Sequence, residues 1–166
     1  GKTWQDYVRD TRLEITCGEA PYLVSRYDTT TGAFIAIENR IGLLDRKLRV
    51  VNENLDSKNE WLKAVETAYK STYGFEWQGD SLLLAREALL ITFIENFTYK
   101  FETEPTLETI QNIVRIISWN IWQMDGLKGV IPNSCKDEFI EISDFFETKT
   151  EIKKCKGCET QNIKSH

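Results

Sequence analysis

The chain has 166 residues, of which 41% are hydrophobic and 28% are charged, so it can bury one sizeable core but has no room for a second full domain. Its net charge of −5 does not attract nucleic acid, and any contact with DNA would need a local basic patch. It has no run of about eighteen apolar residues and no signal-peptide pattern, which predicts a cytoplasmic protein that does not enter a membrane.

The first third of the chain predicts a strand, a turn and two helices. The apolar run 12–16 is typical of a short strand, and a cysteine-glycine pair at 17–18 ends it. Pro21 suits the first position of a helix, which predicts a helix over 22–27. The mixed apolar spacing of 34–51 is also interpreted as helical.

Strands and helices alternate in the middle of the chain. Periodicity predicts, in order, an amphipathic helix with a serine cap over 57–69, a strand over 73–77, a buried helix over 81–101, an amphipathic helix over 106–118 and a strand over 120–126. Such alternation argues for an α/β fold in which helices cover a parallel sheet.

Each of the three predicted strands carries an acidic residue near its end: Glu14, Glu76 and Asp125. In an open parallel sheet, ligands bind in the crevice outside the carboxyl ends of the strands. Three carboxylates there could bind an amine, the hydroxyls of a ribose and the amine of a base. A single acid at a strand end is often a helix cap or a surface charge, but three in this order favour a shared nucleoside site.

These segments resemble the motifs of S-adenosylmethionine-dependent methyltransferases, in particular the adenine-specific DNA methyltransferases and methylation subunits of restriction-modification systems. The stretch LEITCGEAPYLV resembles the first motif of that family, YGFEWQGDSLLLAREAL its second and NIWQMDGL its third. The resemblance implies a Rossmann-like domain over 1–131 with a helical insertion at about 29–70. It implies that S-adenosylmethionine contacts Glu14, Cys17 and Gly18 with its methionine end, Glu76 and Trp77 with its ribose and adenine, and Asp125 and Gly126 with its adenine edge.

The function that the resemblance implies is that of a DNA methyltransferase-like protein in a restriction-modification or phage DNA-modification system, with DNA and a restriction or defence protein as partners. Adenine methyltransferases carry an Asp/Asn-Pro-Pro-Tyr/Phe sequence that holds the target amine of a flipped base. This chain has no such sequence, so no catalytic residue is assigned. A non-enzymatic, degenerate methyltransferase fold that acts as inhibitor or adaptor of a defence complex is therefore an alternative.

A second alternative is a magnesium-dependent nuclease. Asp28, Asp45 and Lys47 fit loosely the pattern of restriction nucleases, in which carboxylates bind Mg²⁺ and a lysine assists the attacking water. This alternative requires the segment around Asp45 to be a strand.

The character of the chain changes to polar and lysine-rich over 132–166, which predicts a polar tail or a small appended module. Within it, Cys155 and Cys158 have the spacing of a zinc knuckle, and Cys135 and His166 would complete a set of four ligands. Four protein ligands leave no open coordination position, so a bound zinc ion would be structural. A tail with unligated thiols is the alternative.

Overall fold

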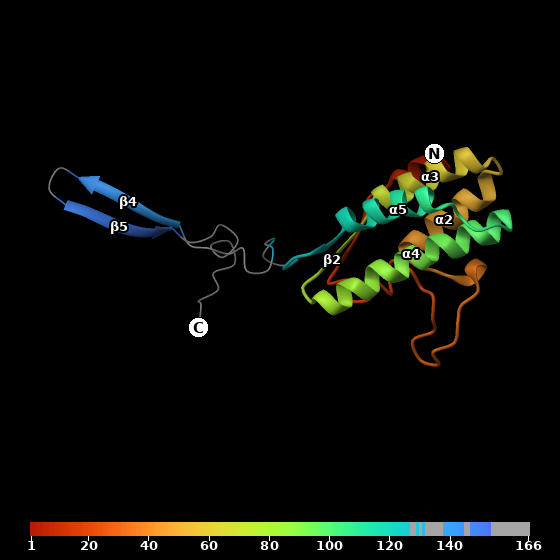
Figure 1. Ribbon diagram of the computed structural model, residues 1–166, viewed down its shortest axis with the longest axis horizontal. Helices are drawn as coiled ribbons and strands as arrows, with labels where there is room; N and C mark the ends of the chain where they lie inside the picture. Colours follow the sequence, from red (N-terminus) through yellow and green to blue (C-terminus); the bar gives the residue numbers. More distant parts are fainter. Residues whose placement is uncertain (127–128, 130, 132–137, 145–146, 154–166) are drawn as a thin grey trace.

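The computed structural model describes residues 1–126, 129, 131, 138–144 and 147–153 (Figure 1). Two sheets are present in this part of the chain. The first is parallel and has the order β1-β2-β3, and the second is antiparallel and pairs β4 with β5. The strands are β1 (Arg12–Ile15), β2 (Thr72–Glu76), β3 (Ile121–Gln123), β4 (Glu138–Asp144) and β5 (Glu147–Lys153).

Helices separate the strands of the parallel sheet, and α3, α4 and α5 all contact β2. The helices are α1 (Trp4–Arg9), the 3-10 helix η1 (Ile37–Asn39), α2 (Leu43–Asn54), α3 (Lys58–Lys70), α4 (Gly79–Phe101) and α5 (Leu107–Asn120). The α/β class and the parallel sheet predicted from the sequence are confirmed. In the ranges that the structure describes, no helix combines the length and apolar character needed to cross a bilayer.

The register of the parallel sheet determines which side chains share a face. Glu14 of β1 pairs with Gly74 of β2, which pairs with Ile121 of β3. All three are buried, and Ile121 belongs to the hydrophobic core. Since side chains alternate along a strand, Leu13 and Ile15 lie on the opposite face, where they are 44% and 47% exposed. The core therefore lies against one face of the sheet.

An aromatic cluster joins α3 to α4 in the core. The buried ring of Trp61 packs edge-on against Phe97 and Phe101, with centroid distances of 5.7 and 5.3 Å. Its indole N–H also donates a 2.7 Å hydrogen bond to Asn52 of α2. This burial explains the long apolar run of α4, which is one of the elements that the sequence predicted.

Two of the helices expected in the first half of the chain differ from the prediction. Residues 22–27 are not helical, because Leu23 N–H donates to Glu14 and Ser25 N–H donates to Asp45, both across long loops. The helix expected over 34–51 begins only at Leu43, after the separate 3-10 turn η1.

The remaining elements agree with the sequence in type and differ at their ends. The helix expected over 57–69 is α3, although the side chain of Ser57 makes no capping hydrogen bond. The third strand ends at Gln123, so Asp125 lies two residues beyond it. The N-terminal helix α1, which begins with a capping box between Thr3 and Asp6, was not expected. The region expected to be a tail or a small appended module contains the antiparallel pair of β4 and β5.

Candidate functional site

Glu14 lies at the carboxyl edge of the parallel sheet and faces the core. Its Oε2 accepts a 3.1 Å hydrogen bond from Leu23 N–H, which holds the loop after β1 against the sheet. Burial raises the pKa of Glu14 to about 7, although hydrogen bonds from the backbone of Tyr22 and Leu23 oppose the rise. The edge of the sheet thus holds a carboxyl group that exchanges a proton near neutral pH.

Glu76, the last residue of β2, joins three parts of the site through its carboxylate. Oε2 accepts a 2.7 Å hydrogen bond from Gly18 N–H in the loop after β1. Oε1 accepts 3.0 Å hydrogen bonds from the N–H groups of Trp77 and Gln78, where α4 begins. A carboxylate offers about four acceptor positions, so these three donors leave about one for a ligand.

Cys17 occupies the space beside these two acids. The absent side chain of Gly74 makes room for it, because a Cβ there would lie 3.0 Å from Cys17 Sγ. Burial, together with the charges of Glu14 and Glu76, raises the pKa of the Cys17 thiol to about 12. A nucleophilic cysteine needs a lowered pKa, so this thiol is a packing group between the carboxylates.

The segment after β3 reaches the same edge. Met124 N–H donates a 3.0 Å hydrogen bond to the carbonyl of Glu76, so the chain continues beside β2 after the strand ends. A Cβ on Gly126 would overlap the side chain of Ile15, so this segment passes close to the end of β1. Asp125 lies between these two contacts. The predicted cofactor-contacting segments therefore converge on one edge, and their contacts with a cofactor remain a prediction.

The exposed Trp77 belongs to this edge as well. Its carbonyl accepts a 3.0 Å hydrogen bond from the side-chain amide of Gln123, the last residue of β3. The residue is 49% exposed, so a ligand can reach its side chain. An aromatic ring at this position could stack on a base.

The predicted zinc ligands, Cys135, Cys155, Cys158 and His166, lie outside the described residues. In the part of the chain that is described, no group of three or more histidine, cysteine, aspartate or glutamate side chains is placed to hold a metal ion. The zinc knuckle therefore stays a prediction.

The geometry required for the nuclease alternative does not occur, because Asp45 and Lys47 lie in the helix α2 and not in a strand. Asp45 accepts hydrogen bonds from Ser25 and Gly42, which fixes the turn before α2. Lys47 is fully buried and donates 2.6 Å hydrogen bonds to the carbonyl of Asp10 and the hydroxyl of Ser71.

Asp28, the third residue of that alternative, organises a turn. Its Oδ1 accepts hydrogen bonds of 2.9 and 2.8 Å from the N–H groups of Thr30 and Thr31. These bonds lower the pKa of Asp28. The contacts of all three residues are accounted for by structural roles.

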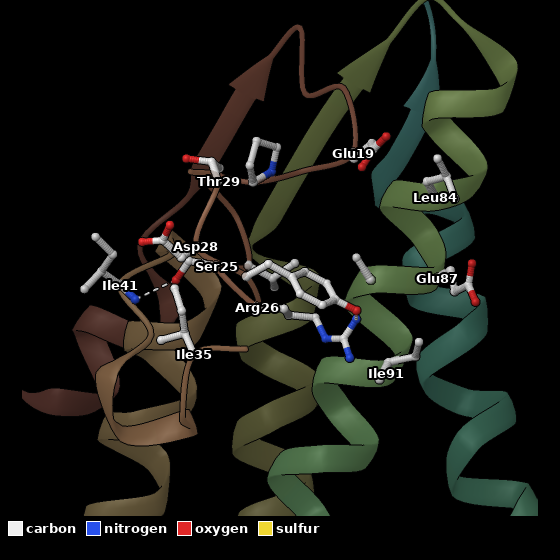
Figure 2. A pocket seen from close by; sticks show the side chains of 14 residues that line it. Glu19, Ser25, Arg26, Asp28, Thr29, Ile35, Ile41, Leu84, Glu87 and Ile91 are labelled. Carbon is white, nitrogen blue, oxygen red and sulfur yellow. Dashed lines mark hydrogen bonds between the residues drawn. The ribbon is translucent and has the colours of Figure 1, made fainter. Parts of the chain in front are cut away.

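A cavity of about 580 Å³, which we call the α4 groove, was not foreseen from the sequence (Figure 2). It lies between the outer side of α4 and the loop that follows β1. Its lining residues are Glu19, Pro21, Val24–Thr29, Ile35, Ile41, Leu84, Glu87, Ala88 and Ile91. None of the seven predicted cofactor-contacting residues lines it. The only sequence signal for it was the apolar run of α4, which is hydrophobic on more sides than one core face requires.

An ion-pair triad fixes the loop to α4 beneath this groove. Arg26 and Arg40 are both buried, and they donate to the two carboxylate oxygens of Glu95 at 2.7 and 2.6 Å. Although burial opposes ionisation, the hydrogen bonds from the two arginines lower the pKa of Glu95. The triad therefore remains charged at neutral pH and holds the groove open in one shape.

No family model matches this chain, and neither a curated protein nor a solved structure matches it. Fold class alone does not determine function, since one fold hosts many activities. Function therefore depends on the side chains that lie at the carboxyl edge.

Proposed function

We propose that the chain is a domain of the DNA methyltransferase type that binds S-adenosylmethionine at the carboxyl edge of its parallel sheet. The observation that carries the proposal is the position of Glu76, whose carboxylate lies where the loop after β1, the end of β2 and the start of α4 meet. Ligands of open parallel sheets bind at this kind of junction. A restriction-modification or phage DNA-modification system is the setting that the sequence motifs favour.

The chemistry of the edge fits the parts of such a cofactor. Glu14 would meet the ammonium group of the methionine end, because a cation stabilises the charged form of a carboxyl whose pKa is about 7. The remaining acceptor position of Glu76 would take a ribose hydroxyl, and Asp125 would accept from the adenine amine. When bound, S-adenosylmethionine supplies an electrophilic methyl group, while these residues bind and orient it.

Calorimetric titration of the protein with S-adenosylmethionine tests this function. We expect saturable binding, and we expect Asp125→Asn to weaken it about ten-fold, or about 1.4 kcal/mol, because the neutral amide oxygen accepts a weaker hydrogen bond from the adenine amine than a carboxylate does. Asp80→Asn is the matched control, because Asp80 is exposed in the first turn of α4. The proposal is wrong if the wild-type protein gives no binding heat.

A second candidate is the non-enzymatic adaptor or inhibitor, and one observation favours it. The buried carboxylates of Glu14 and Glu76 both accept hydrogen bonds from the chain's own loop after β1, as purely structural groups would. The absent Pro-Pro motif agrees with this candidate. Incubation with methyl-labelled S-adenosylmethionine and adenine-containing DNA separates the two candidates, because transfer of label to DNA excludes an inert adaptor.

A further inference from the structure

We propose that the α4 groove is a docking site for a basic amphipathic helix of a partner protein. This inference goes beyond the proposed function, because the groove shares no lining residue with the predicted cofactor edge. It depends on the apolar walls of the groove, the charge of its rim and its fixed shape.

The walls of the groove are apolar and elongated. Leu84, Ala88 and Ile91 repeat at the spacing of one helical stripe, so they form a continuous ridge along α4. Ile35 and Ile41 lie on the other side of the groove in Figure 2. Leu84 is 44% exposed and Ile41 is 71% exposed, so both walls leave apolar surface in water. A helix with apolar side chains at similar spacing would cover this ridge.

The rim of the groove is acidic. Glu19 and Glu87 are exposed and, within the described residues, neither makes an ion pair or a side-chain hydrogen bond. Asp28 adds a third carboxylate, and its Oδ1 accepts hydrogen bonds from Thr30 and Thr31. The one basic residue in the lining, Arg26, pairs with Glu95, whose single negative charge it shares with Arg40. The triad thus carries one net positive charge against the three carboxylates of the rim. The rim therefore complements lysine and arginine side chains, and the net charge of −5 would speed their approach.

The shape of the groove is set before a partner arrives. Arg26 anchors the loop to Glu95 of α4, and Ser25 anchors it to Asp45 of α2. Ser25 Oγ also accepts a 2.7 Å hydrogen bond from Ile41 N–H, drawn as a dashed line in Figure 2. A rigid groove avoids the entropy cost of ordering a loop on binding. A partner helix with apolar side chains on one face and basic residues beside them would complement both the apolar walls and the acidic rim.

Fluorescence anisotropy with a dye-labelled synthetic peptide tests the proposal. The probe is a leucine-lysine peptide of about fourteen residues, about four turns long, patterned as an amphipathic helix. A second peptide has the same composition in scrambled order, and a third has glutamate in place of lysine. We expect the patterned basic peptide to bind and the other two to bind at least about ten-fold more weakly, a difference of about 1.4 kcal/mol.

Matched variants locate the binding on the surface. Glu19→Gln with Glu87→Gln should weaken the patterned peptide about ten-fold. Glu104→Gln with Glu108→Gln removes the same charge from exposed positions outside the groove and should change binding less than about two-fold. Ile41→Ser should also weaken binding, whereas Leu107→Ser, at a residue 70% exposed on α5, should not.

Several results would overturn the proposal. The patterned peptide could fail to bind, the scrambled peptide could bind equally well, or the groove and control variants could bind alike, which would show nonspecific attraction to an acidic protein. These outcomes are independent of cofactor binding, because Asp125→Asn leaves the groove unchanged.

Discussion

The carboxylate of Glu76 ties the end of β2 to the loop after β1, because its Oε2 accepts a 2.7 Å hydrogen bond from the N–H of Gly18, 58 residues earlier in the sequence. The same carboxylate accepts from Trp77 and Gln78, where α4 begins. One buried side chain thus positions three elements of the proposed cofactor edge.

Glu76→Gln should destabilise the protein. Glutamine retains one acceptor oxygen and puts an NH₂ group where the other oxygen accepted, so at least one backbone N–H loses its partner. We expect the free energy of unfolding to fall by about 1–3 kcal/mol, measured by urea denaturation. Glu87→Gln, at an exposed site on α4, is the control and should stay within about 0.5 kcal/mol of wild type. Equal stability of the two variants would contradict the bridging role.

Glu14 should make stability fall as the pH rises toward neutral. Its folded-state pKa is about 7, whereas its usual value is 4.5, so between these values the folded protein binds more protons than the unfolded chain. The stabilisation is complete below pH 4.5 and is lost as pH rises through 7, with a total of about 3 kcal/mol. Urea denaturation across this range should show the slope.

Glu14→Gln provides the comparison for this slope. Glutamine keeps an acceptor for Leu23 N–H and carries no charge, so the variant should lose this part of the pH dependence. Binding of S-adenosylmethionine to the wild type should strengthen as pH rises through about 7, because only the ionised carboxyl attracts an ammonium group. If the free energy of unfolding of Glu14→Gln changed with pH as steeply as that of the wild type, the titration would belong to another group.

Lys47 should have the opposite effect at alkaline pH. Burial lowers its pKa from 10.5 to about 8, so between these values the unfolded chain binds more protons and stability rises with pH. The expected rise is about 3 kcal/mol over the whole interval. Lys47→Met keeps most of the side-chain stem and should abolish the rise, whereas Lys63→Met, at an exposed site on α3, should retain it. A rise that survives in Lys47→Met would refute the assignment.

The parallel sheet could be predicted because its local signals agree with its tertiary structure. Each strand is a short apolar or aromatic run, and the amphipathic pattern of α3 and α5 separates the runs by helices. Parallel pairing then brings Glu14 and Glu76 to one edge with no further information.

The parts that could not be predicted depend on contacts between distant residues. Residues 22–27 have a helical pattern, but Glu14 and Asp45 bind the N–H groups of Leu23 and Ser25 from 9 and 20 residues away. The α4 groove could not be predicted because α4 is apolar on several sides, so its periodicity does not distinguish the core face from the exposed one.

The sequence around Lys47 allowed two interpretations, a helix or the strand of a nuclease. A nuclease would need it as a strand, but the spacing of Leu44, Leu48 and Val51 is helical, and all three are buried in α2. The helical prediction for this segment is therefore correct over α2. The nuclease alternative, which depended on a short and common pattern, does not fit.

Cys17 should react much more slowly in the folded protein than in the unfolded chain. The thiol is buried, and a pKa of about 12 leaves only about one thiolate in ten thousand at pH 8. Alkylation with iodoacetamide, followed by peptide mapping, measures Cys17 separately from the other three cysteines. We expect labelling at least about 100-fold slower without urea than in urea. Because burial is the largest cause of the raised pKa, Glu14→Gln should leave the labelling slow. Fast labelling of the folded protein would instead mark Cys17 as an accessible thiol and would overturn its assignment as the packing group between Glu14 and Glu76.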